Sequence, residues 1–217
     1  FIIAEANVKM EKDPKTGELC IVDDKLIARH FGEFIETDKM SVDLIDVSPK
    51  QVVAVSTACI PFLENDDGQR ALMGANMQRQ AIPLLQPHTP IVGTGLEKVA
   101  AKYSGLACLA EKAGTITYVD STKIIAQNDD GTETTYELEK FARSNNGTCI
   151  NQTAIVKLGQ HVEKDDVIAD GPSMEKGELA LGQNVVIAFT TWHGYNYEDA
   201  VIISERLVKD DVYTSIH

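Results

Sequence analysis

The sequence predicts a mostly β fold with short helices (α+β). Short runs rich in valine and isoleucine recur between glycine-containing or charged turns along most of the 217 residues, a pattern typical of short strands. Residues 114–141 alternate polar and apolar side chains on both sides of the turn NDDG, which predicts a β-hairpin. A clear helical pattern is confined to residues 64–82.

Composition and charge exclude several classes of protein. Hydrophobic residues make up 43% of the chain, enough for a globular core. No apolar run approaches the roughly 18 residues of a membrane-spanning helix, so we expect no membrane contact and a cytoplasmic protein. The 33 acidic and 20 basic residues give a net charge of −13, which argues against binding nucleic acid through overall charge. The four cysteines form no CxxC pair, which argues against a zinc site or a disulfide framework.

The N-terminal residues alternate short apolar runs with charged turns. FIIAEANV is followed by the turn KDPKTGE and then by LCIVDD and KLIARHF. This rhythm predicts a small β-rich module over residues 1–50. Residues 51–217 are expected to form a separate region.

The predicted helix over residues 64–82 has recognisable ends. Asp66 or Asp67 can cap its N-terminus, and Pro83 is expected to stop it. At about 100° per residue, Arg70, Met73, Met77 and Gln80 share one face.

Two interpretations of this face remain open. In the structural one, the methionines fill an irregular gap in the core and Arg70 reaches back to a local carboxylate such as Asp66. In the functional one, the face contacts an anion, because residues 68–96 include Arg70 and Arg79 but no Asp or Glu.

Residues 154–190 are expected to form part of a barrel or sandwich. Their valine and isoleucine runs are interrupted by glycine every several residues. The stretch KLGQHVEKDDVIADG also resembles the rhythm of biotinyl and lipoyl carrier domains. Lys176 is the nearest candidate for a modified lysine, but SMEKGE lacks the flanking residues of those domains. A carrier or a purely structural β module is therefore the alternative function.

The segment WHGYNYED, residues 192–199, ends in the adjacent carboxylates Glu198 and Asp199. Two explanations compete for this pair. Acidic residues stabilise the first turn of a helix through its dipole, and carboxylates on a turn can also hold a hard metal ion or its bound water. The aromatic residues of the segment are expected to pack the turn.

Four long stretches resemble the β subunit of bacterial-type RNA polymerase. They are IPFLENDDGQRALMGANMQRQAIPLLQPHTPIVGTGLE, RSNNGTCINQ, VIADGPSMEKGELALGQNVVIAF and WHGYNYEDAVIISERLVKDDVYTSIH. They follow the order of the family over roughly residues 50–217. The chain begins with Phe1 and ends in the strand-like VYTSIH, so we expect it to be an internal part of that subunit.

The resemblance implies a reaction and a cofactor. The family transfers a nucleotidyl group: an RNA 3′ oxygen attacks the α-phosphate of an incoming nucleoside triphosphate, with Mg²⁺ held mainly by the partner β′ subunit. It also implies contacts with the β′ and α subunits, a σ factor, the DNA template and the RNA–DNA hybrid. The chain by itself is expected to be inactive.

The resemblance also implies roles for individual residues. Arg70 matches the arginine that reaches the nucleotide triphosphate, and Asn76 and Gln80 match polar positions near the RNA. Glu198 and Asp199 match the paired acids beside the magnesium ion that the nucleotide brings, where they act through bound water. Residues 1–50 match a peripheral module, and residues 51–217 match part of the catalytic core, an incomplete double-psi β-barrel.

Overall fold

The computed structural model describes residues 1–14 and 17–217, with the backbone alone for residues 49–50. Two residues of the predicted turn KDPKTGE therefore lie outside the described part. The chain divides into two compact units, Phe1–Ala54 and Val55–His217. Within the described residues, short strands predominate and the longest helix has eleven residues. The predicted mostly β fold with short helices is confirmed.

The first unit is built on a four-stranded sheet in the order β5-β4-β1-β6. A hairpin joins β4 to β5 through Phe31 and Gly32, which both have positive φ angles, as a two-residue turn requires. A second hairpin pairs β2 with β3. The strands are β1 Ile3–Ala4, β2 Met10–Lys12, β3 Leu19–Ile21, β4 Lys25–His30, β5 Glu33–Asp38 and β6 Leu44–Ile45.

A small core holds the first unit together. Ala4, Leu26 and Ala28 are buried in it. Leu26 and Ala28 are two residues apart on β4, so they point to the same face of the sheet. Arg29 forms an ion pair with Asp46 beyond β6.

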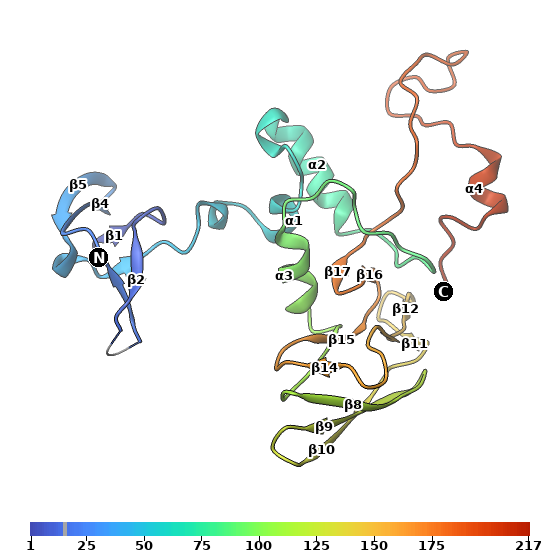
Figure 1. Ribbon diagram of the computed structural model, residues 1–217. Coiled ribbons are helices and arrows are strands. Elements are labelled where there is room, and N and C mark those ends of the chain that lie inside the picture. Colours follow the sequence, from blue (N-terminus) through green and yellow to red (C-terminus); the bar gives the residue numbers. More distant parts are fainter. Residues whose placement is uncertain (15–16) are drawn as a thin grey trace. The chain divides into compact units, whose positions relative to one another are not determined.

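The second unit contains a four-stranded sheet, β10-β9-β8-β14, and a three-stranded sheet, β13-β15-β7. Figure 1 shows the two sheets next to each other, below helix α3. Two further hairpins pair β11 with β12 and β16 with β17. The strands are β7 Cys108–Leu109, β8 Gly114–Val119, β9 Lys123–Asn128, β10 Glu133–Glu137, β11 Ala142–Arg143, β12 Cys149–Ile150, β13 Thr153–Ala154, β14 His161–Val162, β15 Val167–Asp170, β16 Met174–Glu175 and β17 Glu178–Leu179.

The core of the second unit lies between these sheets. Ile116 on β8, Ile124 on β9 and Ile168 on β15 are its largest fully buried side chains. The predicted hairpin around NDDG is confirmed as the pairing of β9 with β10. The run before that turn is two strands rather than one, because the Asp120 carboxylate accepts the backbone N–H groups of Thr122 and Lys123 and turns the chain between β8 and β9.

The helices of the second unit are short. They are α1 Val55–Ala58, α2 Gly68–Gln78, α3 Leu96–Lys102 and α4 Glu205–Lys209. Asp67 caps α2 by accepting the N–H of Gln69 at 3.1 Å. The predicted span 64–82 was too long at both ends. Asp66 is already extended, and the residue before Pro83 is disfavoured in a helix.

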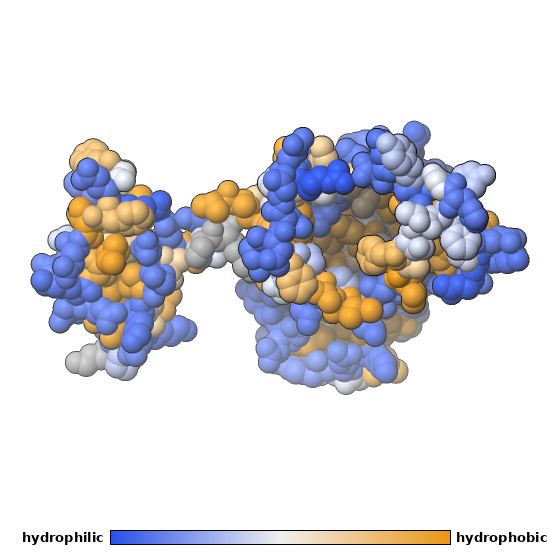
Figure 2. All heavy atoms as spheres, turned by 90° about the horizontal axis from the view of Figure 1, so that it is seen from above, coloured by the Kyte–Doolittle hydropathy of each residue, from blue (hydrophilic) through white to orange (hydrophobic). Residues whose placement is uncertain are grey.

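Two apolar runs of the second unit form no strand within the described residues. Residues 185–189 and 201–203 follow β17 and carry exposed valine, isoleucine and phenylalanine side chains. Figure 2 shows that hydrophobic residues, in orange, lie among hydrophilic ones, in blue, on the surface of the protein. Closure of a double-psi barrel therefore stays a prediction. None of the described helices is long and apolar enough to cross a membrane.

Candidate functional site

An ion pair joins helix α2 to the segment of residues 190–199. Nη2 of Arg70 donates a hydrogen bond to Oδ1 of Asp199 at 2.9 Å. The two residues are 129 positions apart in the chain. The fold therefore brings the predicted phosphate-contacting arginine against one of the two predicted metal-side acids.

Helix α2 fixes the position of the Arg70 backbone, from which the side chain extends. Arg70 lies in the first turn of α2, and its Nη1 is 3.7 Å from the sulfur of Met73, three residues further along the same face. The hydrogen bond to Asp199 raises the pKa of Arg70 above its ordinary value. An arginine guanidinium is protonated with or without such a partner, so it is a permanent positive charge at this position.

The pair is open to solvent. The Arg70 side chain is 64% exposed and that of Asp199 is 80% exposed. An exposed ion pair contributes only about 0 to 1 kcal/mol. Both charged groups are consequently available to a ligand that offers a stronger interaction.

The structural interpretation of the α2 face was wrong. Met73 and Met77 are exposed rather than buried in a core. Arg70 pairs with Asp199 and not with Asp66. The face that carries Arg70, Met73 and Met77 is an exposed surface of the second unit.

Asn76 and Gln80 lie further along the same part of the chain and are not brought into contact with Arg70. Oδ1 of Asn76 accepts a hydrogen bond from Nη2 of Arg79. Gln80 is exposed just beyond the helix, where its N–H donates to the carbonyl of Met77 at 3.0 Å. Their predicted contact with RNA stays a prediction.

The segment of residues 190–199 is a series of turns held by Asn196. Its Oδ1 accepts the N–H of Trp192 at 3.0 Å, and its Nδ2 donates to the carbonyl of Thr190 at 2.5 Å. His193 and Glu198 have positive φ angles of 50° and 59°. Such angles are uncommon for residues other than glycine and store strain in the backbone.

No helix begins at Glu198 or Asp199. Helix α4 begins at Glu205, and its cap is Ser204, whose hydroxyl accepts the N–H of Arg206 at 3.3 Å. The explanation of the two acids as a helix start is therefore wrong. Of the aromatic residues predicted to pack the turn, Trp192 packs edge-on against His193, with ring centroids 5.5 Å apart, whereas Tyr195 and Tyr197 are mostly exposed.

The carboxylates of Glu198 and Asp199 fit a hydrated magnesium ion. Both are exposed, and carboxylate oxygens are the ligands that Mg²⁺ prefers, directly or through water. Among the described residues, no group of three or more His, Cys, Asp or Glu side chains could hold a metal. Because Mg²⁺ has octahedral coordination, two carboxylates can serve only as part of a site that other ligands complete.

Residues 83–89 tie the end of α2 to the strands of the second unit. The N–H of His88 donates to the carbonyl of Gly182 at 2.8 Å. The N–H of Thr89 donates to Oε2 of Glu175 at 2.6 Å, and Nδ2 of Asn184 donates to the carbonyl of Thr89 at 2.8 Å. These bonds hold the exposed helix in place without burying its face.

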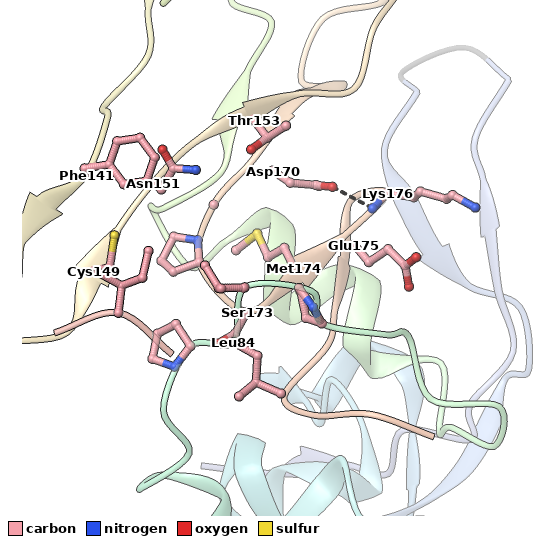
Figure 3. A pocket seen from close by; sticks show the side chains of 16 residues that line it. Leu84, Phe141, Cys149, Asn151, Thr153, Asp170, Ser173, Met174, Glu175 and Lys176 are labelled. Atoms are coloured by element: carbon pink, nitrogen blue, oxygen red, sulfur yellow. Dashed lines mark hydrogen bonds between the residues drawn. The ribbon is translucent and has the colours of Figure 1, made fainter. Parts of the chain in front are cut away.

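A cavity of about 260 Å³ lies between residues 83–87 and the β16–β17 hairpin. Figure 3 shows the carboxylate of Asp170 pointing to the backbone of Lys176. Asp170 accepts the N–H groups of Lys176 and Gly177, each at 2.6 Å, and burial raises its pKa. The cavity is lined by Lys176, the candidate carrier lysine, but by none of Arg70, Asn76, Gln80, Glu198 and Asp199.

Asp170 was missed by the sequence analysis, and its role is to fix a turn. Lys176 and Gly177 both have positive φ angles and form the tip of the hairpin. Lys176 is thus an exposed lysine on a tight turn, as a carrier domain would need. The family comparison below includes this hairpin and gives no support to the carrier alternative.

Comparisons with known proteins agree with one another. The family RNA polymerase Rpb2, domain 6, matches residues 109–217. The whole chain is 60% identical to the DNA-directed RNA polymerase subunit beta of Limosilactobacillus reuteri (strain DSM 20016) and covers 18% of it. It is 58% identical to the subunit of the same name from Lactiplantibacillus plantarum and 60% identical to that of Oenococcus oeni, again over the whole chain and 18% of the relative. The chain thus spans less than a fifth of the length of these curated relatives.

Proposed function

Because the chain belongs to the family of RNA polymerase β subunits, we propose that it supplies part of the nucleotide site of a DNA-directed RNA polymerase. In this proposal, Arg70 binds the triphosphate of the incoming nucleotide. Glu198 and Asp199 hold water molecules of the magnesium ion that accompanies it. The chain does not carry out the reaction alone.

The observation that carries the proposal is the meeting of Arg70 and Asp199 on an exposed surface. A magnesium–triphosphate complex carries both an anion and a cation. A site for it needs a positive group beside carboxylates, all open to solvent. Arg70, Asp199 and the adjacent Glu198 provide this combination within one unit of the fold.

Each of these residues has a defined task in nucleotidyl transfer. The Arg70 guanidinium can grip two phosphate oxygens at once and stabilise the charge that grows on the leaving pyrophosphate. Magnesium, when bound, neutralises phosphate charge and orients the reacting groups. Glu198 and Asp199 accept hydrogen bonds from water bound to that ion and so orient it from outside its first shell.

Asn76 and Gln80 are proposed to contact the RNA backbone. Amide side chains can bond to phosphate and sugar oxygens without selecting a base. Gln80 is exposed and available for this contact, while Asn76 shares its carbonyl oxygen with Arg79. Residues 68–96 lack acidic side chains, so a nucleic-acid backbone would meet no repulsive charge from this segment.

The assembled enzyme is proposed to contain the β′ and α subunits and to bind a σ factor, the DNA template and the RNA–DNA hybrid. The β′ subunit would hold most of the magnesium ligands. Residues 51–217 would form part of the catalytic core as an incomplete double-psi β-barrel, and residues 1–50 a peripheral module. The enzyme would work in the cytoplasm.

Replacement of Arg70 tests the proposal. In the assembled polymerase, Arg70→Ala should lower kcat/KM for nucleotides by about tenfold or more, because one charge-assisted contact to phosphate contributes about 1.5 to 3 kcal/mol. Steady-state elongation on a defined template measures this change. Arg206→Ala is the matched control, since Arg206 is an exposed arginine on α4 that pairs with Asp210. Equal kinetics for Arg70→Ala and the control would refute the proposed role.

A further inference from the structure

We propose that Arg70 and Asp199 exchange partners when the nucleotide binds. In the free site they pair with each other. On binding, the triphosphate takes Arg70, and the release of Asp199 makes its carboxylate available to magnesium-bound water. This inference rests on the proposed function and adds to it a coupling between phosphate binding and metal binding.

The arginine side of the exchange follows from the geometry of its contacts. One hydrogen bond, from Nη2 to Asp199 at 2.9 Å, satisfies only part of a guanidinium that has five N–H donors. Within the described part of the chain, Nη1 contacts the Met73 sulfur at 3.7 Å, and a thioether is a weak acceptor. A triphosphate offers several charged oxygens and can bond bidentately. It should therefore displace the single carboxylate.

The release of Asp199 in the proposed exchange follows from the same hydrogen bond. While Asp199 accepts a hydrogen bond from Arg70, its Oδ1 is engaged by the guanidinium. A hydrated magnesium ion would have to compete with the guanidinium for that carboxylate. Once phosphate has removed the guanidinium, the competition ends.

The exchange requires a pair that breaks easily, and the exposure of both side chains meets this requirement. At 64% and 80% exposure, neither charge is buried when the pair opens, so little desolvation opposes the change. Among the described residues, the only other group that the guanidinium would leave is the Met73 sulfur, 3.7 Å from Nη1, and a thioether is a weak acceptor.

Glu198 provides a natural comparison. It is the residue next to Asp199 and is also exposed. The ion pair with Arg70 is made by Asp199 and not by Glu198. Neutralising either acid removes one negative charge from the same place, but only Asp199→Asn also removes the competitor for Arg70.

Thermodynamic linkage makes the coupling measurable. If phosphate frees Asp199 for the metal, then the metal must favour phosphate binding by the same factor. Asp199→Asn should therefore strengthen nucleotide binding without magnesium and weaken the gain that magnesium brings. If Asp199 only attracted the metal, Asp199→Asn would reduce the gain from magnesium but would not strengthen nucleotide binding without magnesium.

The experiment uses an assembled elongation complex whose RNA ends in a 3′-deoxynucleotide, so that the cognate nucleoside triphosphate binds but does not react. Its Kd is measured with excess EDTA and with magnesium for wild type, Asp199→Asn, Glu198→Gln, Arg70→Ala and the double variant Arg70→Ala/Asp199→Asn. In EDTA, Asp199→Asn should bind about two- to fivefold more tightly than wild type, the factor that an exposed ion pair supplies. Glu198→Gln should stay within about 1.5-fold of wild type.

The double variant identifies the cause. In the Arg70→Ala background, Asp199→Asn should no longer tighten binding in EDTA, because the pair is already absent. Tightening that persists without Arg70, or an unchanged Kd for Asp199→Asn in EDTA, would overturn the exchange. If Arg70→Ala leaves the Kd unchanged in both conditions, the proposed function itself is wrong. That outcome differs from a failure of the exchange alone.

Discussion

Glu97, in the first turn of α3, is buried: only 4% of the residue is exposed. Burial opposes its ionisation, but hydrogen bonds from Thr94 and Gly95 outweigh that effect and hold its pKa below the ordinary value. The N–H groups of Thr94 and Gly95 both donate to it at 2.8 Å. A single buried charge is thus stable when backbone donors surround it.

Glu97→Gln should destabilise α3 by about 1 to 3 kcal/mol, because the amide accepts these bonds less strongly than the carboxylate. Amide hydrogen exchange of residues 94–102 measures the change. The lowered pKa of Glu97 means that its contribution is present above the ordinary value of 4.5 and is lost as the pH falls through the folded-state pKa. The difference between variant and wild type should therefore shrink in acid. Glu133→Gln, at an exposed strand position, should change nothing, and an equal effect there would contradict the explanation.

Residue-level predictions from the sequence succeeded where the chemistry is local. Asp67 was predicted as a possible N-cap because an aspartate directly before a helix can accept the free N–H groups of the first turn. The partner of Arg70 could not be predicted, since it lies 129 residues away and its approach depends on the path of the whole second unit. Asp170 left a usable signal: an aspartate shortly before a tight KG turn can accept the two N–H groups at the tip.

The β8–β9 pair is the element on which the second unit depends most, because it carries Ile116 and Ile124 into the core. Gly114 begins this pairing opposite Asn128. A Cβ atom at Gly114 would lie 2.4 Å from the carbonyl oxygen of Gln127 and 2.7 Å from the Cα of Asn128. Glycine is therefore required by close backbone approach at this point.

Gly114→Ala should lower the free energy of unfolding by about 2 to 3 kcal/mol, since the backbone of β9 must move to admit the methyl group. Urea unfolding of the chain measures the loss. Gly182→Ala is the matched control, because a Cβ there meets nothing within 4 Å. Similar losses for both variants would show that the close approach is not the cause.

Strands and helices were predicted well where a few neighbouring residues determine the turn between them. The turn NDDG correctly predicted the pairing of β9 with β10. The break between β8 and β9 was missed, although Asp120 followed by Ser and Thr is itself a turn signal. Helix ends were misplaced because propensity changes gradually along α2, whereas its N-terminus is set by the extended backbone of Asp66 and Asp67.

At the scale of the whole molecule, the strand-like runs 185–189 and 201–203 stand out because they have apolar side chains and no strand partner among the described residues. The sequence predicted β structure for the first run, as part of residues 154–190, and could not show what covers either run. A strand forms only when it pairs with another segment, and the sequence of these runs does not identify that segment. This is why the double-psi barrel remains an expectation from family resemblance.

The purified chain should therefore self-associate at micromolar concentration, driven by these runs. Phe189→Ser should reduce the association measured by sedimentation velocity, because Phe189 is 96% exposed within one of them. Phe31→Ser is the control, since Phe31 is 93% exposed at an isolated hairpin tip in the first unit. A monomeric wild-type chain, or an equal effect of both variants, would argue against this prediction.

We propose that Arg70, Glu198 and Asp199 together bind the magnesium–nucleotide complex. The elongation rate of the assembled polymerase as a function of magnesium concentration, compared between wild type and Glu198→Ala/Asp199→Ala, tests it most directly. We predict that the double variant needs more magnesium and elongates more slowly at saturation, while its binding to promoter and hybrid is nearly unchanged, because hydrated magnesium loses the acceptors that orient it. A magnesium curve that coincides with that of wild type would contradict the claim.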